Sequence, residues 1–203
     1  MPHTDYDVVI AGGGMVGASL ALCLDCFSRA GLRVLVVESF PLPPAGEGKP
    51  AYRPSFDARS TALSFGSALM TAASQGWPAL GYVVENAWLG NVLLNQLRLH
   101  TNVEFLSPAS VEAVVVSQGY ATLTLREGDT LRDVTSQLVA IADGADSGLR
   151  TQLGISASVD DYHQVAVIAN VGTEKHHGGC AYERFTERGP LALLPLSEDE
   201  AGM

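Results

Sequence analysis

The sequence has 203 residues, of which 47% are hydrophobic and 17% charged, and its formal net charge is −10. A chain of this size and apolarity can bury a core, which excludes an intrinsically disordered protein. The negative charge argues against a nucleic-acid-binding surface and gives no attraction to anionic lipid. No apolar run reaches the ~18 residues that span a bilayer, and the first residues lack the basic start of a secretory signal, so we expect a cytoplasmic protein.

The chain begins with a pattern of strand, glycine loop and helix. An apolar strand is predicted at residues 6–11, the glycine loop GGGMVG covers 12–17, and a helix at 15–30 is followed by a second strand at 33–38. Glu38 stands 21 positions after Gly17 (38 − 17), at the tip of that second strand. This context is typical of a dinucleotide-binding βαβ unit. The alternative, a glycine-rich turn in an ordinary βαβ unit, is disfavoured because the acidic residue is in place.

Each residue of this fingerprint has a physical role. Gly12 permits the sharp turn from strand to helix, Gly14 lets the backbone approach a pyrophosphate, and Gly17 lets the helix lie close to the strand. The phosphates then meet the free N–H groups and the positive end of the helix dipole. Glu38 can accept hydrogen bonds from both ribose hydroxyls, and its charge would repel a 2′-phosphate. The bound adenosine is therefore expected to belong to FAD or NAD rather than to NADP.

Further along the chain, strands dominate. We predict a helix that starts near residues 60–64, a second helix at 86–99, and strands at 103–106, 110–117, 120–127 and 134–142. The last of these strands is apolar, so we expect it to be buried on both faces in the same sheet as the first strand. It ends at Asp143-Gly144, which would then face the glycine loop. Strands expected at 164–172, 182–186 and 191–196 would begin a second, antiparallel sheet.

The cysteines and histidines do not predict a redox or metal site. Cys23 and Cys26 form a C-x-x-C pattern inside the first helix, away from the helix N-terminus that stabilises a thiolate, so packing is the expected role. Cys180, with His176 and His177 nearby, lacks a second pair of ligands at zinc spacing. No metal is expected.

Taken in order, the motifs resemble a known family. They are GGGMVG with Glu38, FDARSTALS, GYVVENAWL, ADGADSGLR, VAVIANV and ERFTERGPLALLPL. This series resembles the FAD-dependent aromatic hydroxylases of ubiquinone biosynthesis, of the 2-polyprenyl-6-methoxyphenol hydroxylase type, within the single-component flavoprotein monooxygenases. The resemblance implies an α/β fold: a Rossmann-like FAD-binding domain of the GR2 type at residues 1–160, and a partial antiparallel-sheet substrate domain at 161–203.

The sequence departs from the family pattern in two places. Leu80 runs directly into Gly81, where the family has some tens of further residues, so we expect a missing insertion at the 80/81 junction. The family also has a third flavin motif, an apolar strand followed by Gly-Asp, and the sequence reaches Met203 before such a motif. The substrate domain is therefore expected to be truncated, and activity of this chain alone is doubtful.

The resemblance also implies which residues bind the cofactor. Arg59 would approach the phosphates on the flavin side, with a salt bridge to Asp57 as the alternative role, and Asn86 would contact the cofactor, cap a helix, or do both. Ser147 and Arg150 are expected to fix the loop after Asp143. The full cofactor-binding set is Gly12, Gly13, Gly14, Met15, Val16, Gly17, Glu38, Arg59, Asn86, Asp143 and Gly144.

The implied reaction is hydroxylation of a polyprenyl phenol. NAD(P)H would reduce FAD, O₂ would form a flavin C4a-hydroperoxide, and its terminal oxygen would attack the ring, while the protein positions the ring and excludes water. No residue can be assigned as the base that ionises the phenol. Arg184 and Phe185 could line the substrate side, although a core or sheet-surface role is favoured.

Other functions remain open. They are another FAD-dependent aromatic hydroxylase, a different FAD- or NAD-dependent oxidoreductase, and a non-catalytic nucleotide-binding fragment; fold alone would not separate them. The motif at Asp143 counts against a plain NAD dehydrogenase, because the resemblance implies that it belongs to an FAD site. An enzyme with a lipid-like phenol as substrate would be either soluble or peripherally attached to the inner face of the membrane, alone or in a biosynthetic complex.

Overall fold

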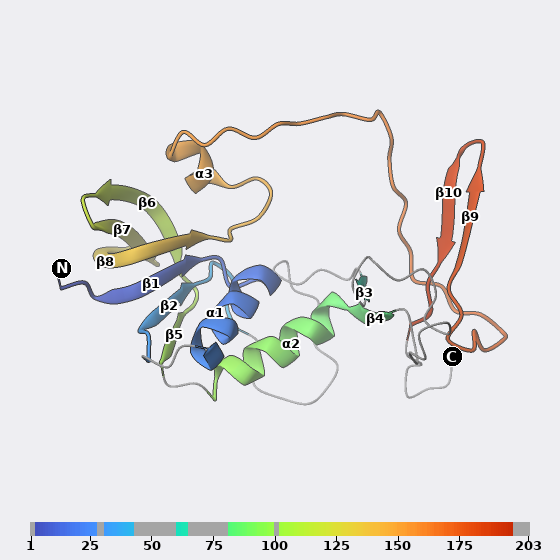
Figure 1. Cartoon of the computed structure of the whole chain (residues 1–203), viewed down its shortest axis with the longest axis horizontal. Coiled ribbons are helices and arrows are strands. Elements are labelled where there is room, and N and C mark those ends of the chain that lie inside the picture. Colours follow the sequence, from blue (N-terminus) through green and yellow to red (C-terminus); the bar gives the residue numbers. More distant parts are fainter. Residues whose placement is uncertain (1–2, 28–30, 43–59, 65–80, 100–101, 197–203) are drawn as a thin grey trace. The chain divides into compact units, whose positions relative to one another are not determined.

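The computed structural model describes residues 3–27, 31–42, 60–64, 81–99 and 102–196 (Figure 1). The chain divides into two units, described separately below: Met1–Asp57 with Ala87–Asp161, and Ala58–Asn86 with Tyr162–Met203. The boundary expected from the sequence, at residues 160/161, stays a prediction.

A six-stranded sheet forms the centre of the first unit, in the order β5-β2-β1-β8-β7-β6. The strands β5, β2, β1 and β8 are parallel, and β8, β7 and β6 continue as an antiparallel meander. The sheet therefore joins a βαβ unit to a meander, and the predicted α/β class is confirmed. Its strands are β1 (Tyr6–Ala11), β2 (Val34–Val37), β5 (Val103–Leu106), β6 (Ser110–Ser117), β7 (Tyr120–Glu127) and β8 (Thr130–Ile141).

Helices cover one face of the parallel strands. α1 (Met15–Phe27) and α2 (Asn86–Leu97) lie on the same side of β1, β2 and β5 in Figure 1. Alternate strand residues face them, because successive side chains point to opposite faces of a sheet. The buried members of this helix-side core are Val8, Ile10, Ala18, Ala21, Val34, Val36, Leu94, Leu97 and Val103.

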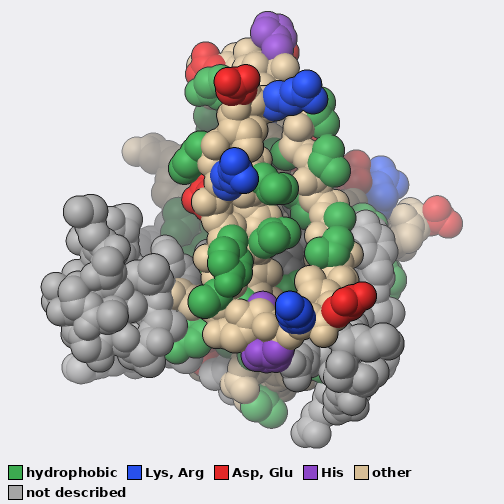
Figure 2. All heavy atoms as spheres, turned by 90° about the vertical axis from the view of Figure 1, so that its right-hand side faces the viewer, with side chains coloured by type: hydrophobic (Ala, Val, Ile, Leu, Met, Phe, Trp, Pro, Cys, Tyr) green, Lys and Arg blue, Asp and Glu red, His purple; other side chains and the backbone are tan. Residues whose placement is uncertain are grey.

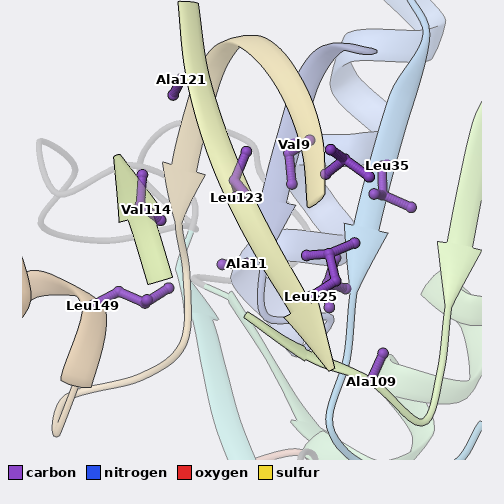
Figure 3. Packing of buried hydrophobic residues seen from close by; sticks show 11 residues of the cluster. Val9, Ala11, Leu35, Ala109, Val114, Ala121, Leu123, Leu125 and Leu149 are labelled. Carbon is purple, nitrogen blue, oxygen red and sulfur yellow. The ribbon is translucent and has the colours of Figure 1, made fainter. Parts of the chain in front are cut away.

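The meander supplies the second core, on the opposite face. Leu123 and Leu125 of β7 are fully buried against Val9 and Leu35 of the parallel strands (Figure 3). Leu149 of the short helix α3 (Gly148–Gln152) closes the same cluster. The parallel strands are thus covered on both faces, which fits their nearly continuous apolar sequences.

β8 corrects one expectation from the sequence. It lies in the same sheet as β1, as predicted, and pairs with it in parallel, but it begins at Thr130 rather than at residue 134. Leu138 is 59% exposed, so the prediction that the strand is buried on both faces is wrong. Leu138 is in register with Val8 and therefore shares the helix side of the sheet. The described parts of α1 and α2 pack instead over β1, β2 and β5.

The second unit contains two separate strand pairs. β3 (Ser60–Ser64) pairs antiparallel with β4 (Gly81–Glu85), and β9 (Tyr182–Thr186) with β10 (Gly189–Leu193). The helix predicted to start near residues 60–64 is wrong for those residues, which form a strand through pairing with a segment twenty residues away. The predicted pair at 182–186 and 191–196 is confirmed as a hairpin, although its second strand begins and ends earlier.

Residues 164–172 do not form the strand expected of them. Val165 and Val167 are 90% and 91% exposed, and no strand of the described residues pairs with this segment. Alternating apolar residues favour a strand only when a neighbouring strand is there to complete its hydrogen bonds.

The β9-β10 hairpin carries apolar side chains on both faces, beside charged ones. Leu193 lies opposite Tyr182 on one face, and Pro190 lies opposite Phe185 on the other. Phe185 is 78% exposed. Figure 2 shows hydrophobic side chains beside basic and acidic ones along this part of the molecule. Within the described residues, no helix has the length and apolarity needed to cross a membrane.

Candidate dinucleotide-binding site

Gly12 occupies a position that only glycine can fill. Its φ is +104°, and a Cβ atom there would collide with the carbonyl of Ala142 at the end of β8. The Gly12 N–H donates to the Val37 carbonyl (2.8 Å), and the Ala142 N–H donates to the Ala11 carbonyl (2.7 Å). The glycine loop and the end of β8 are therefore in direct contact, as the sequence predicted.

Gly17 brings α1 close to β1. A Cβ atom at this position would overlap the Gly12 carbonyl oxygen and lie 3.1 Å from Cγ2 of Ile10. The roles predicted for Gly12 and Gly17 thus have a direct steric cause. The role of Gly14 toward a pyrophosphate stays a prediction; its carbonyl accepts from the Ala18 N–H (2.9 Å).

The first turn of α1 presents a site suited to an anion. Helix α1 begins at Met15, directly after the glycines, and has no acidic residue in its first turn. Met15 packs against the helix-side core, whereas the side chain of Val16 is 71% exposed. The free N–H groups and the dipole of such a helix end attract phosphate.

Glu38 is buried beside the glycine loop, with only 7% of its surface exposed. Its Oε2 accepts from the Gly13 N–H at 2.8 Å, and its Oε1 accepts from the Phe40 N–H at 2.8 Å and from Ser39 Oγ at 3.3 Å. The carboxylate is thus held in place by neighbouring backbone, at the end of β2 where a ribose is expected.

Asp143 and Gly144 follow β8 and are exposed. A Cβ atom at Gly12 would lie 2.9 Å from the Asp143 backbone nitrogen, which places this turn against the glycine loop. Ser147 is buried and accepts from the Arg150 N–H at 3.0 Å, as the N-cap of α3. Ser147 thus has the loop-fixing role expected of it.

Nine of the eleven predicted binding residues lie in the first unit. Arg59 lies outside the described residues. Asn86 begins α2, is buried, and accepts from Thr61 Oγ1 of β3 at 2.5 Å. It belongs to the second unit, so a contact with the cofactor stays a prediction. The nine residues in the first unit are Gly12, Gly13, Gly14, Met15, Val16, Gly17, Glu38, Asp143 and Gly144.

The cysteines and histidines considered for a redox or metal site form no such site among the described residues. Cys23 is exposed on α1, so the packing role predicted for it is wrong, and the side chain of Cys26 lies outside the described residues. His176 stacks on His177 (centroids 4.7 Å apart), and His177 Nε2 lies 2.8 Å from the Leu196 carbonyl oxygen. Among the described residues, no group of three or more His, Cys, Asp or Glu is placed to hold a metal ion.

Sequence reasoning missed the contribution of β5. The backbone of Glu38 is bonded on both sides to this region, through the Leu106 carbonyl and the Ala109 N–H, and Phe105 lies against Gly13. The fingerprint covers only β1, α1 and β2. The pairing of β5 with β2 joins residues about seventy positions apart, and no local signal announces it.

Solved structures of aromatic hydroxylases share the fold of this chain. No family model matches the chain. The fold is that of p-nitrophenol 4-monooxygenase PnpA from Pseudomonas putida DLL-E4, with a TM-score of 0.55, 25% identity, and coverage of 75% of this chain and 44% of that one. Aklavinone-11 hydroxylase, solved in complex with FAD and aklavinone, has the same fold, with a TM-score of 0.54 and 20% identity. The match covers 76% of this chain and 36% of that one. The described fold is thus that of solved aromatic hydroxylases.

Curated relatives narrow this class. The chain is 30% identical to 3-demethoxyubiquinol 3-hydroxylase of Escherichia coli (strain K12), over 100% of the chain and 58% of that protein. It is 29% identical to ubiquinone hydroxylase UbiL of Rhodospirillum rubrum, over 97% of this chain and 51% of that protein. It is 26% identical to the mitochondrial ubiquinone biosynthesis monooxygenase COQ6 of Homo sapiens, over 96% of this chain and 49% of that protein. The chain is a homologue of the ubiquinone-biosynthesis hydroxylases, which confirms the resemblance, and it spans about half the length of these relatives.

Proposed function

We propose that the protein containing this chain is an FAD-dependent monooxygenase that hydroxylates a polyprenyl phenol in ubiquinone biosynthesis. The observation that carries the proposal is the buried carboxylate of Glu38, held beside a glycine loop whose residues 12 and 17 have no room for a side chain. The relationship to ubiquinone hydroxylases supports the choice of substrate class.

The residues present fit FAD. The first turn of α1 offers N–H donors and no competing carboxylate, which suits a pyrophosphate. Glu38 would accept from the ribose hydroxyls, and its negative charge disfavours a 2′-phosphate. Asp143 and Gly144 would lie along the same cofactor. When bound, the flavin would supply the oxygen-transfer chemistry, with NAD(P)H as reductant.

The role of this chain is to bind and orient. Gly12 packs against Ala142, so the glycine loop adjoins the Asp143 turn at the end of β8. Close packing of this kind would help to orient a bound cofactor, and misplacement of a reacting group by about 1 Å can lower a rate about a hundredfold. The base that would ionise the phenol is not among these residues.

The cofactor is tested by binding measurements on the complete gene product. Glu38→Ala should raise the dissociation constant of FAD roughly 10- to 150-fold, because hydrogen bonds to a charged group contribute roughly 1.5 to 3 kcal/mol. Glu112→Ala is the matched control, since this carboxylate pairs with Arg126 on the β6-β7 hairpin. Tight binding of NAD with no binding of FAD would contradict the proposal and favour a different oxidoreductase.

The substrate is tested in cells. Deletion of the gene should cause a polyprenyl phenol one hydroxyl short of the quinone to accumulate, and the wild-type gene should restore ubiquinone. Normal ubiquinone with no such intermediate would instead assign the protein to another aromatic hydroxylase. We further propose that the enzyme meets its lipid-like substrate peripherally, at the membrane surface or in a biosynthetic complex. Co-sedimentation of the complete protein with membranes or with biosynthetic partners tests this.

A further inference from the structure

β5 fixes the main chain of Glu38. The Glu38 N–H donates to the Leu106 carbonyl at 3.0 Å, and the Ala109 N–H donates to the Glu38 carbonyl at 2.8 Å. Val37 is in register with Leu106, so Glu38 continues the ladder between β2 and β5. The position of the carboxylate therefore depends on a strand that carries no part of the glycine motif.

Phe105 of the same strand reaches the glycine loop itself. A Cβ atom at Gly13 would lie 2.5 Å from Cζ of Phe105, 2.9 Å from Cβ of Glu38 and 3.2 Å from Glu38 Oε2. Phe105 is half-buried and packs against the helix-side core. The ring and the stem of Glu38 together occupy the space where any side chain of residue 13 would stand.

We propose that Phe105 is a positioning residue of the dinucleotide site. Its ring packs against Gly13 and holds the Gly13 N–H at its 2.8 Å hydrogen bond to Glu38 Oε2. Without the ring, the loop could move away from the carboxylate, and the helix end and the ribose acceptor would lose their fixed spacing. The ligand named in the tests below rests on the proposed function, whereas the packing of Phe105 on the loop does not.

The test compares two truncations on one strand. Phe105→Ala in the complete gene product should raise the dissociation constant of FAD about tenfold, and Phe105→Leu should restore it to within about threefold of wild type. Val103→Ala is the control, because Val103 is a buried residue of β5 that contributes to the same core without being among the atoms nearest Gly13. It should lower the urea midpoint while leaving the FAD dissociation constant within about twofold.

Two results would overturn the proposal. One is FAD affinity within about twofold of wild type in Phe105→Ala; the other is an equal loss of affinity in Val103→Ala, which would show general destabilisation.

If the wild-type protein does not bind FAD, the proposed function fails, and the role of Phe105 is then tested by hydrogen exchange of the Gly13 amide. That amide should lose about tenfold protection in Phe105→Ala and not in Val103→Ala. Unchanged protection would refute the role.

A pair of variants tests the contact directly. Gly13→Ala should destabilise the protein, and the destabilisation should be smaller in a Phe105→Ala background because one of the two obstructing groups is gone. The relief should be partial, since Cβ of Glu38 remains 2.9 Å away. Strictly additive effects would show that the ring and the loop are not coupled.

Discussion

The six-stranded sheet and the β9-β10 hairpin place similar apolar residues in opposite surroundings. In the sheet, Val9 and Leu35 are fully buried against the meander, while helices cover the opposite face of the same strands. In the hairpin, Phe185 and Leu191 remain 78% and 61% exposed. An isolated two-stranded pair is marginally stable at best in water. Apolar sequence alone does not make a core; the covering layers do.

The candidate site lies on the buried side of this contrast. The elements that hold Glu38 and the glycine loop belong to the unit that contains both hydrophobic cores. The β9-β10 hairpin of the other unit leaves its large apolar side chains more than half exposed.

Adding one carbon at a glycine should distinguish the two regions most strongly. Gly17→Ala should cost about 4 kcal/mol of unfolding free energy, because the new Cβ would overlap the Gly12 carbonyl oxygen. Gly172→Ala in the other unit should be nearly neutral, since nothing lies within 4 Å of the added atom. Urea unfolding followed by circular dichroism measures both. Equal costs would contradict the contrast.

Truncating a leucine tests the core in the same way. Leu125→Ala on β7 should lower the free energy of unfolding by about 3 kcal/mol, because a fully buried side chain leaves a cavity. Leu193→Ala on β10 is the matched change at a site that is 53% exposed, and it should cost less than about 1 kcal/mol. A comparable loss at Leu193 would show that the hairpin has a core of its own.

The cap of α3 should have an intermediate effect. Ser147→Ala removes the hydroxyl that accepts from the Arg150 N–H, and it should cost about 1 kcal/mol. Ser117→Ala, at an exposed position at the end of β6, serves as control. Hydrogen exchange of the Arg150 amide provides the readout, which should speed up in Ser147→Ala alone. Unchanged exchange would show that the hydroxyl does not cap the helix.

The smallest expected effect is a change in how the stability of the fold depends on acidic pH. The Arg33 N–H donates to Asp7 at 2.8 Å and the Arg33 guanidinium lies 3.3 Å from the same carboxylate, which together lower the pKa of Asp7. A lowered pKa stabilises the folded state above the ordinary value of 3.8, and this contribution is lost as the pH falls through the folded-state pKa. Asp7→Asn should therefore cost under about 1 kcal/mol at pH 7 and nearly nothing in strong acid.

Thermal unfolding across pH checks this prediction. The melting temperatures of wild type and Asp7→Asn should converge below the ordinary pKa of 3.8. Asp129→Asn, at the exposed turn between β7 and β8, controls for the loss of a negative charge elsewhere in the same unit. A constant gap at every pH would mean that Asp7 acts through its shape and not through its charge.

The fold was predictable where the signals are local. Strands β6 and β7 have the predicted bounds, because Gly119 and Gly128 adopt positive φ values of +89° and +58° in the turns that end them. The strand at 60–64 was mistaken for a helix start because its partner lies beyond a segment of sixteen residues. Residues 164–172 were mistaken for a strand because their pattern is right and no described strand pairs with them.

The residues of the candidate site were likewise predictable only where the signal is local. Gly12, Gly17 and Glu38 follow from the fingerprint, whose spacing is contained in one stretch of chain. Phe105 and the backbone of Leu106 do not, because parallel pairing brings them next to Glu38 from about seventy residues away. The fingerprint identifies the groups that would touch a dinucleotide, and the distant strand determines how firmly they are held.

The pairing of β1 with β8 has a consequence for synthesis of the protein. Ala11 is in register with Ile141, so the turn that holds Gly12 against Ala142 joins residues 130 positions apart. Contacts of such separation form late and slowly. On the ribosome, β1 must wait with one edge open until β8 emerges, which exposes an apolar strand to wrong partners. The packing of Gly12 against Ala142 cannot form before residue 142 has left the ribosome.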